Sequence, residues 1–435
     1  MMLSKLWAMT RQAKQTDGGF SDLVQACHRL VSERGQANMY ALGNEVVQAW
    51  TGLKKNKREA FFAALATEFA PDQQAVLDAA HAYVQSPDVK HLAVLSAVTE
   101  APRQELFRRI NRVKNGTPTL LDMRVALMEC MRTRDGLQAV DHDFLHLLSS
   151  WFNPGFLHFE AVSWNSPAAL LEKIIQHEAV HAIDSWDHLR RRLEADRRCY
   201  AFFHPQLPHE PLIFVEVALT NDMPDAIAPL IATQAASPRS VGERTVSKPT
   251  TAVFYSISNC QPGLRGVSLG NFLIKRVAQH LALEVPSLKT YCTLSPVPGL
   301  LRWVLAVDAS ALPPHIARAH AQVIAWRASL SALGPESLEQ APESLRDALA
   351  RLCAYYLVNG SHLPQADPVA RFHLDNGARL ERINVGGDLS KNGLKQSLSV
   401  MVNYLYSLGD VETRHQQFVD RHVSHSREVK KWLKE

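Results

Sequence analysis

The sequence predicts an α+β protein of two domains: an all-α helical bundle over residues 1–153, followed over residues 154–435 by a mixed sheet flanked by helices. Three observations support this prediction. The chain of 435 residues is too long for one ordinary hydrophobic core. Apolar residues recur at helical spacing as far as the break at Asn153-Pro154-Gly155. Beyond that break, β-branched and aromatic runs alternate with helical patterns.

The first domain is expected to be helical from residue 20 to about residue 152. The first helix opens at Phe20, and the others cover residues 44–53, 57–69, 71–84, 102–113, 120–133 and 141–152. The breaks between them are short, which predicts antiparallel neighbours and hence a bundle. Its histidines and tryptophans are scattered, so we expect the bundle to support homo-oligomerisation, as a dimer or tetramer, or to brace the second domain.

Composition excludes several classes of protein. With 46% apolar and 21% charged residues the chain is globular, and a net charge of +4 is too small to predict nucleic-acid binding. There is no run of about 18 apolar residues, so no membrane span is expected. The six cysteines lie far apart without a C-x-x-C pair, which is typical of reduced thiols. The N-terminus lacks the long apolar core of a secretory signal, so we expect a cytoplasmic protein.

One segment of the second domain, from Thr250 to Leu300, has the most specific pattern. Residues 250–258 predict a strand, residues 261–270 a turn, residues 271–283 a helix and residues 288–294 a second strand. A helix that begins after a glycine-bearing turn offers free N–H groups and a positive dipole end to a pyrophosphate. The segment is therefore a candidate site for coenzyme A, although a glycine-bearing loop before a helix is also common ordinary structure.

Within that segment, residues 265–273 resemble the acyl-CoA loop of the GNAT acetyltransferases, R/Q-x-x-G-x-G/A, with Ser268 in place of the middle glycine. The resemblance implies a GNAT-like mixed sheet whose fourth and fifth strands splay apart around the acyl chain. It implies that Arg265, Gly266, Ser268 and Gly270 bind the CoA moiety. Ser295, at the mouth of the fifth strand, would face the acyl end, although a serine before a proline also commonly begins a turn.

Several motifs taken together resemble the malonyl-CoA decarboxylase family and occur in that family's order. They lie at residues 199–205, 210–220, 254–258, 294–296 and 372–378, and the resemblance is strongest from Trp164 to Tyr406. It implies a carbon–carbon lyase that converts malonyl-CoA into acetyl-CoA and carbon dioxide, in fatty-acid metabolism or malonate catabolism. No separate cofactor is expected, because the CoA moiety enters as part of the substrate and the thioester itself holds the developing charge.

The same resemblance assigns catalysis to Ser295 and His373. The local sequence predicts a short helix around His373: Asp367 suits its N-cap, Pro368 its first turn, and Asn376-Gly377 a left-handed C-cap. His373 would then lie near the C-terminal end of the helix, where the dipole favours the imidazolium. Without the resemblance, a lone histidine in such a place is more often a structural residue.

The chemistry of decarboxylating a malonyl thioester explains why a serine and a histidine would be needed. Electrons from the breaking bond enter the thioester carbonyl and give an enolate, which needs hydrogen-bond donors at its oxygen and an acid at its carbon. A pocket that desolvates the carboxylate favours its departure. His373 is expected to supply the proton or stabilise the enolate, and Ser295 to orient the carboxylate or relay a proton.

Four further residues are weaker candidates. Tyr404 and Asn403 resemble the family's Asn-Tyr pair, and the phenol of Tyr404 is expected to donate to the acyl oxygen or to be a core aromatic. Asn403 and Ser256 are expected to contact the substrate. Asp222, after a predicted strand, is expected to orient His373 or to form a turn.

Three other functions remain open on the sequence. A GNAT-type acyltransferase would use the same CoA site with an acceptor, and a non-catalytic CoA-binding protein would need neither Ser295 nor His373. The third is a zinc hydrolase, because His177, Glu178 and His181 match H-E-x-x-H on a predicted helix over residues 167–183. No third ligand follows at the spacing that zinc proteases use, so we expect no metal.

Overall fold

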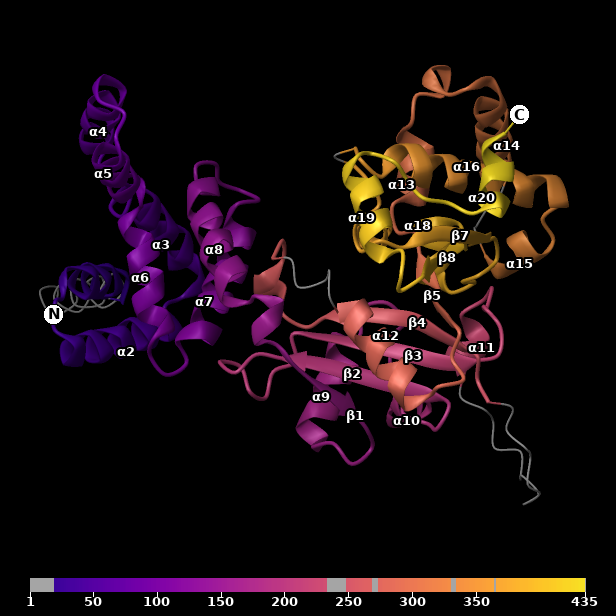
Figure 1. Cartoon of the computed structure of the whole chain (residues 1–435), viewed down its shortest axis with the longest axis horizontal. Helices are drawn as coiled ribbons and strands as arrows, with labels where there is room; N and C mark the ends of the chain where they lie inside the picture. The colour runs from indigo at the N-terminus through magenta and orange to yellow at the C-terminus, as the bar shows by residue number, and fades with distance from the viewer. Residues whose placement is uncertain (1–18, 233–247, 268–272, 330–333, 364, 435) are drawn as a thin grey trace, which may run out of the picture. The chain divides into compact units, whose positions relative to one another are not determined.

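The chain forms two compact units, shown in the computed structural model of Figure 1. The structure describes residues 19–232, 248–267, 273–329, 334–363 and 365–434. Of these, the first unit takes the residues within Met1–Leu157, His204–Pro208 and Gln261–Ser268, and the second unit takes the rest. The first unit is helical and the second holds the sheet, which confirms the predicted fold class.

In its described residues, the helical unit contains the helical residues 19–32 and seven further helices. These are α2 (Gln36–Gly52), α3 (Lys55–Thr67), α4 (Gln73–Gln85), α5 (Val89–Thr99), α6 (Pro102–Asn111), α7 (Gly116–Cys130) and α8 (Gln138–Trp151). Large aromatic side chains fill its core, and Trp50 stacks at a tilt against Phe61 and Phe62. The indole N–H of Trp50 donates to Asp122 at 2.8 Å, so the buried ring keeps a polar partner.

Helix α5 is absent from the sequence prediction, which leaves residues 85–101 without an element. It has no buried residue, and its apolar side chains are not sorted onto one core-facing side. Val89 is 82% exposed and Val94 is 54% exposed. Because the prediction depends on a periodic buried face, a helix without one gives little signal.

The turn before the expected CoA loop folds with the helical unit. It forms η2 (Pro262–Leu264), and Arg124 of α7 donates a hydrogen bond to the carbonyl of Gly263 at 2.7 Å. A Cβ at position 263 would lie 2.6 Å from the Leu121 carbonyl, so only glycine allows this approach.

The described part of the second unit is built on one mixed sheet of eight strands. They are β1 (His158–Val162), β2 (Arg197–Phe203), β3 (Ile213–Thr220), β4 (Thr251–Asn259), β5 (Thr290–Thr293), β6 (Ser295–Pro296), β7 (Arg379–Asn384) and β8 (Met401–Tyr406). Their order is β1-β2-β3-β4-β5-β8-β6, with β7 also paired to β8. All pairs are antiparallel except β4 with β5.

Strands β4 and β5 separate after a short parallel pairing, as the GNAT-like fold predicts. Their register joins Thr251–Phe254 to Thr290–Thr293 and ends there. The chain then continues from β5 into β6, which pairs with β8 instead, Ser295 opposite Val402. Ser295 therefore lies where the two strands part.

Helices cover both faces of the sheet. On one face, α9 (Ala168–His177) and α10 (Trp186–Arg192) pack against Cys199, Ala201 and Phe203. On the opposite face, Tyr200 contacts His280 of α12 (Leu273–Glu284), because successive strand residues point to opposite sides. The strands and helix predicted between Thr250 and Leu300 are confirmed within one or two residues, except that residues 271–272 lie outside the described part of the chain.

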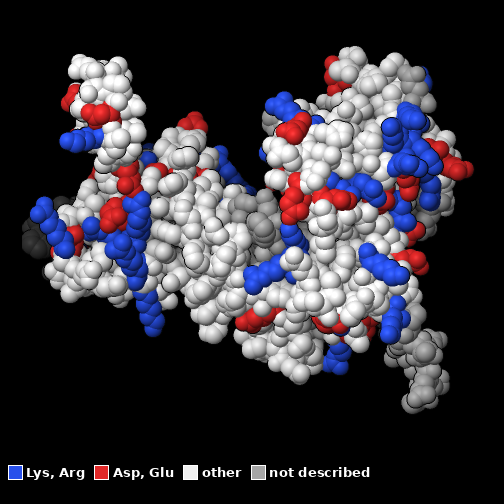
Figure 2. Space-filling model, in the orientation of Figure 1, with Lys and Arg blue, Asp and Glu red and all other residues white. Residues whose placement is uncertain are grey.

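Most of the remaining helices lie near β7 and β8 (Figure 1), whereas α11 (Ala228–Ile231) packs against β3 and β4. The others are α13 (Leu300–Ala306), α14 (Pro314–Ser329), α15 (Pro335–Glu339), α16 (Glu343–Gly360), α17 (Pro368–Asp375), α18 (Lys391–Ser397), α19 (Val411–Val419) and α20 (Arg427–Leu433). Acidic and basic side chains are interspersed on the face shown in Figure 2, in keeping with the small net charge. No helix in the described part of the chain combines the length and apolar character that crossing a membrane requires.

Candidate active site

Ser295 and His373 lie in direct contact inside the second unit. Ser295 Oγ is 3.0 Å from His373 Nε2, and the two side chains are almost fully buried. Ser295 is held by the pairing of β6 with β8, and Pro296 and Pro298 limit how far that strand can continue. The two residues are 78 positions apart in the sequence, so only the fold brings them together.

The helix that carries His373 begins and ends as its sequence predicts. Asp367 Oδ1 accepts hydrogen bonds from the backbone N–H groups of Val369 and Ala370, and Pro368 is the first helical residue. Gly377 has φ +73°, and a Cβ there would lie 2.1 Å from the Val411 carbonyl. Only glycine suits this left-handed position, so α17 has a fixed end and His373 a fixed place on it.

Two tyrosines of β8 complete the surroundings of His373. The Tyr406 hydroxyl is 2.9 Å from Nδ1, and the ring of Tyr404 stacks on the imidazole with 4.7 Å between centroids. Tyr406 is absent from the predicted site. It is two residues after Tyr404, and residues i and i+2 of a strand share a face, so strand periodicity alone would have nominated it.

The predicted imidazolium is wrong for the resting protein. Burial lowers the pKa of His373 to about 3, because the charged ring loses its hydration and no carboxylate of the described residues replaces it. This loss outweighs the helix C-terminal dipole, whose effect on a charge is smaller. His373 is therefore neutral at neutral pH.

A neutral imidazole fixes the direction of the hydrogen bonds around it. Ser295 Oγ donates to Thr293 Oγ1 at 2.8 Å, so its lone pair is available to accept from His373 Nε2–H. Nδ1 then accepts from the Tyr406 hydroxyl. The arrangement is a chain of hydrogen bonds from Tyr406 through His373 to Ser295 and Thr293.

Tyr404 is fully buried, and its hydroxyl has no hydrogen-bond partner among the described residues. Burial raises the pKa of this phenol well above its usual range, so it keeps its proton. Buried hydroxyl groups are rarely left unpaired. The Tyr404 hydroxyl is therefore a candidate donor to a bound molecule.

Asn403 has another role than the one predicted from the sequence, and Asp222 has one of its two predicted roles. Both hydrogens of the Asn403 amide are used, on the carbonyls of Thr293 and Pro224, and its oxygen accepts from Arg382 and Asn384. Asn403 thus ties strands together and has no group left for a substrate.

Asp222 is exposed, and it is not a hydrogen-bond partner of His373 in the described structure. Its backbone carbonyl accepts from the Thr220 hydroxyl, as expected of a turn residue. Tyr406 makes the contact with Nδ1 that was expected of Asp222.

The predicted CoA-binding residues are only partly described. Arg265 and Gly266 are exposed on the turn after η2, where Gly266 has φ +85°. Ser268 and Gly270 lie outside the described residues. The Ser256 hydroxyl is engaged within the protein, where it donates to the carboxylate of Glu178, 2.8 Å from each oxygen.

The H-E-x-x-H residues do not form the helix that a zinc site requires. Helix α9 ends at His177, so the predicted helix over residues 167–183 is wrong in its second half. Glu178 has extended backbone angles, and its carboxylate accepts from the N–H groups of Val180 and His181 as well as from Ser256. This carboxylate closes a turn against the sheet, which explains the early end of the helix. In the described residues, no group of three His, Cys, Asp or Glu side chains could hold a metal ion.

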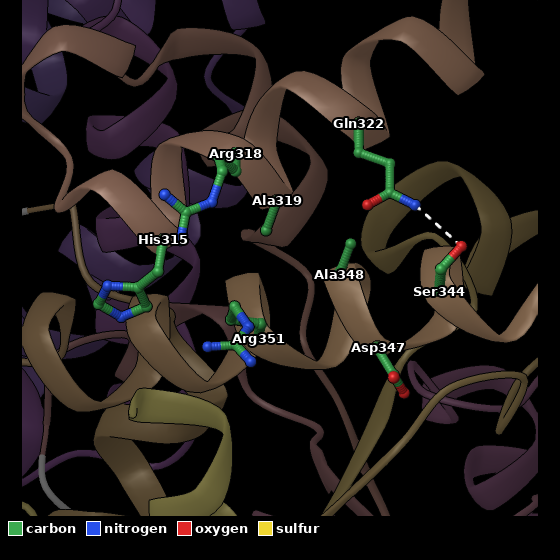
Figure 3. A pocket seen from close by; sticks show the side chains of 8 residues that line it. All are labelled: His315, Arg318, Ala319, Gln322, Ser344, Asp347, Ala348 and Arg351. Atoms are coloured by element: carbon green, nitrogen blue, oxygen red, sulfur yellow. Dashed lines mark hydrogen bonds between the residues drawn. The ribbon is translucent and has the colours of Figure 1, made fainter. Parts of the chain in front are cut away.

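A separate hollow of about 220 Å³ lies between α14 and α16 (Figure 3). His315, Arg318 and Arg351 gather at one end of it, and Gln322 donates to Ser344 at the other. None of the predicted site residues lines it. The hollow is therefore distinct from the Ser295–His373 pair.

Comparisons with known proteins point to one family. The chain matches the models described as "Malonyl-CoA decarboxylase N-terminal domain" over residues 69–152 and "Malonyl-CoA decarboxylase C-terminal domain" over residues 155–435. It is 34% identical to the mitochondrial malonyl-CoA decarboxylase of the goose Anser anser anser, over 88% of this chain and 82% of that protein. The mouse protein of the same name is 37% identical, over 70% of this chain and 65% of its own length.

Two solved structures have the same fold throughout. The malonyl-CoA decarboxylase of Rhodopseudomonas palustris superposes with a TM-score of 0.84 at 41% identity, covering 95% of this chain and 99% of that one. The corresponding protein of Agrobacterium vitis gives 0.83 at 42% identity, covering 95% and 100%.

Proposed function

The chain belongs to the malonyl-CoA decarboxylase family of carbon–carbon lyases, and we propose that Ser295 and His373 are the residues with which it converts malonyl-CoA into acetyl-CoA and carbon dioxide. The observation that carries this assignment is the buried 3.0 Å contact between Ser295 Oγ and His373 Nε2. The contact joins β6, which begins where β4 and β5 separate, to the capped helix α17.

The first step breaks the bond between the carboxylate carbon and C2 of the malonyl group. Its electron pair moves into the thioester carbonyl, which becomes an enolate, and carbon dioxide leaves. The Tyr404 hydroxyl is our candidate donor to the enolate oxygen, because it is buried beside His373 and unpaired among the described residues. A donor already placed where negative charge develops lowers the barrier.

The second step adds a proton to C2, so one proton is consumed in each turnover. His373 is neutral in the resting protein, but a bound malonyl carboxylate brings a negative charge that favours the imidazolium. We assign His373 as the acid that takes up this proton from solvent. Ser295 relays it: its hydroxyl turns from Thr293 towards C2, gives its proton to C2 and accepts one from Nε2. Tyr406 keeps the ring in place through Nδ1.

No metal, biotin or electron sink is needed in this scheme, because the thioester carbonyl holds the charge of the intermediate. The CoA moiety enters with the substrate. Arg265 and Gly266, with Ser268 and Gly270 outside the described residues, are the proposed CoA-binding residues. Their support is the resemblance to the acyl-CoA loop and the start of α12 close behind it.

The helical unit is proposed to mediate self-association into a dimer or tetramer. Helices α4 and α5 expose Leu77, Val84, Val89, Leu92 and Val94, an apolar set that a monomer would leave in water. Light scattering of the purified protein measures the number of subunits. A monomeric mass would contradict this proposal.

The compartment and pathway are also proposals. The six cysteines have free thiols, five of them buried, which supports a reducing compartment such as the cytoplasm. The goose and mouse relatives carry "mitochondrial" in their names. Cell fractionation decides between the two, and the phenotype of a deletion strain on malonate decides between malonate catabolism and fatty-acid metabolism.

The deciding experiment for the reaction is mass spectrometry of the protein incubated with malonyl-CoA alone, with and without EDTA. Acetyl-CoA and carbon dioxide should form at equal rates in both samples, without ATP or an acceptor. Intact malonyl-CoA would point to an acyltransferase that awaits its acceptor. Activity lost only with EDTA would point to a metal enzyme.

A further inference from the structure

One buried carboxylate links the turn after Ser295 to the helix of His373. Asp367 is 1% exposed. Its Oδ1 caps α17 through the N–H groups of Val369 and Ala370, each at 3.0 Å. Its Oδ2 accepts from the backbone N–H of Gly299 at 2.8 Å, and Gly299 is the residue from which α13 begins.

The sequence around Gly299 is suited to this link. A Cβ at position 299 would lie 2.3 Å from the Tyr356 hydroxyl and 3.1 Å from Asp367 Oδ2, so the absence of a side chain permits the approach. Between Ser295 and Gly299, Pro296 and Pro298 each fix one backbone angle. A constraint applied at Gly299 is therefore passed to Ser295 through a stiff connection.

We propose that Asp367 is a positioning residue for the decarboxylation, holding Ser295 Oγ and His373 Nε2 at their 3.0 Å contact. This inference rests on the function proposed above for those two residues. The Asp367 side chain holds both the N-terminal end of α17, which carries His373, and Gly299, which lies four residues after Ser295. Burial raises the pKa of Asp367, while the N–H groups of Ala370, Gly299 and Val369 favour the carboxylate. A displacement of about 1 Å at a catalytic pair can cost about a hundredfold in rate.

Asp367→Asn tests the link with little change in shape. The asparagine keeps one oxygen to cap α17 but presents an NH₂ group, which cannot accept, to the Gly299 N–H. We expect kcat for malonyl-CoA to fall at least about tenfold while KM stays within about threefold. Asp72→Asn is the matched control, because Asp72 caps α4 with two N–H groups at 2.9 and 3.0 Å in the helical unit. Its kcat should equal that of the wild type.

A double-variant cycle separates positioning from general destabilisation. In a Ser295→Ala background, Asp367→Asn should lower kcat by less than about twofold further, because no pair is left to position. An equal loss in both backgrounds would overturn the inference. So would a wild-type kcat for Asp367→Asn while Ser295→Ala is impaired, an outcome that leaves the proposed function intact. Wild-type turnover in Ser295→Ala would instead defeat the proposed function.

If Asp367→Asn does not fold, Gly299→Ala tests the positioning role of Asp367 instead. This variant keeps the α17 cap, and its backbone angles of φ −87° and ψ −13° suit alanine. Its Cβ would lie 2.3 Å from the Tyr356 hydroxyl and 3.1 Å from Asp367 Oδ2, so residue 299 must move and its N–H shifts away from Asp367. A fall in kcat of at least about fivefold, with CoA binding and circular dichroism retained, is expected. An unchanged kcat in this variant would overturn the inference.

Discussion

The Tyr406 hydroxyl lies 2.9 Å from Nδ1 of His373, on the ring nitrogen that Ser295 does not contact. Each ring nitrogen therefore has a hydrogen-bond partner, Ser295 at Nε2 and Tyr406 at Nδ1. This fixes the ring orientation and the position of its proton without a carboxylate. Burial can keep the ring neutral because no acidic side chain among the described residues pairs with it.

Tyr406→Phe should lower kcat about tenfold, because the ring loses the donor that fixes Nδ1. KM should change little, since Tyr406 is assigned to the ring and not to the CoA moiety. Steady-state kinetics with malonyl-CoA measures both. Tyr291→Phe is the matched control, because Tyr291 pairs with Tyr406 across β5 and β8 and its hydroxyl has no partner in the described structure. Equal activity of the two variants would contradict the role of Tyr406.

Ser295→Ala and His373→Ala should each lower turnover by at least about tenfold while CoA binding survives. If the two side chains act as one relay, the double variant should be little worse than the poorer single variant. Kinetics and calorimetric CoA titration of the three proteins check this. Fully multiplicative losses would show that the residues act independently.

Acid should destabilise the fold through its buried histidines. Burial lowers the pKa of His373 to about 3 and that of His181 to about 4, whereas both take up protons near pH 6.5 once unfolded. The unfolded chain then binds more protons below pH 6.5, so stability falls as the pH drops from about 6.5 towards 4. Each histidine should cost about 2 kcal/mol between about pH 6.5 and pH 5.

Urea unfolding at pH 7 and at pH 5 tests this dependence. His181→Gln should lose about 2 kcal/mol less than the wild type over that interval. His209→Gln is the control, because His209 is exposed, and it should lose as much as the wild type. Equal acid sensitivity of all three proteins would contradict the prediction.

Asn403→Ala should reduce stability by about 3 kcal/mol, because four groups lose their hydrogen bond to the Asn403 amide and two of them, on Thr293 and Asn384, belong to buried residues. Thermal unfolding measures the loss. Asn165→Ala, at an exposed position, should unfold at the wild-type temperature. A stable Asn403→Ala variant that has lost substrate affinity would instead support the original expectation of a substrate contact.

Sequence reasoning succeeded where the cause was local. The cap of α17 by Asp367 and the left-handed Gly377 depend on neighbours within a few residues, so their chemistry can be read from the chain. Resemblance to a family supplied what no local rule gives, the assignment of both Ser295 and His373 to catalysis. The strands around Thr250–Leu300 were predictable because β-branched runs between turns have a clear pattern.

Sequence reasoning failed where the hydrogen-bond partner of a residue is distant in the sequence. Asn403 bonds the Pro224 carbonyl, 179 positions away, and Ser256 bonds Glu178, 78 positions away. Neither contact has a sequence signal, so both residues were assigned to the substrate. The charge of His373 was mistaken for a similar reason, since the helix end is visible in the sequence and the burial is not.

The contact of Arg124 with the Gly263 carbonyl bears on how this protein can be divided. A catalytic fragment that started after residue 157 would keep the turn at Pro262–Leu264 but lose the helix that supports it. Grafting the bundle of a distant relative would fail in the same way unless its α7 offered a matching guanidinium and room for the glycine. Truncation and domain exchange therefore have to preserve the contact between Arg124 and this turn.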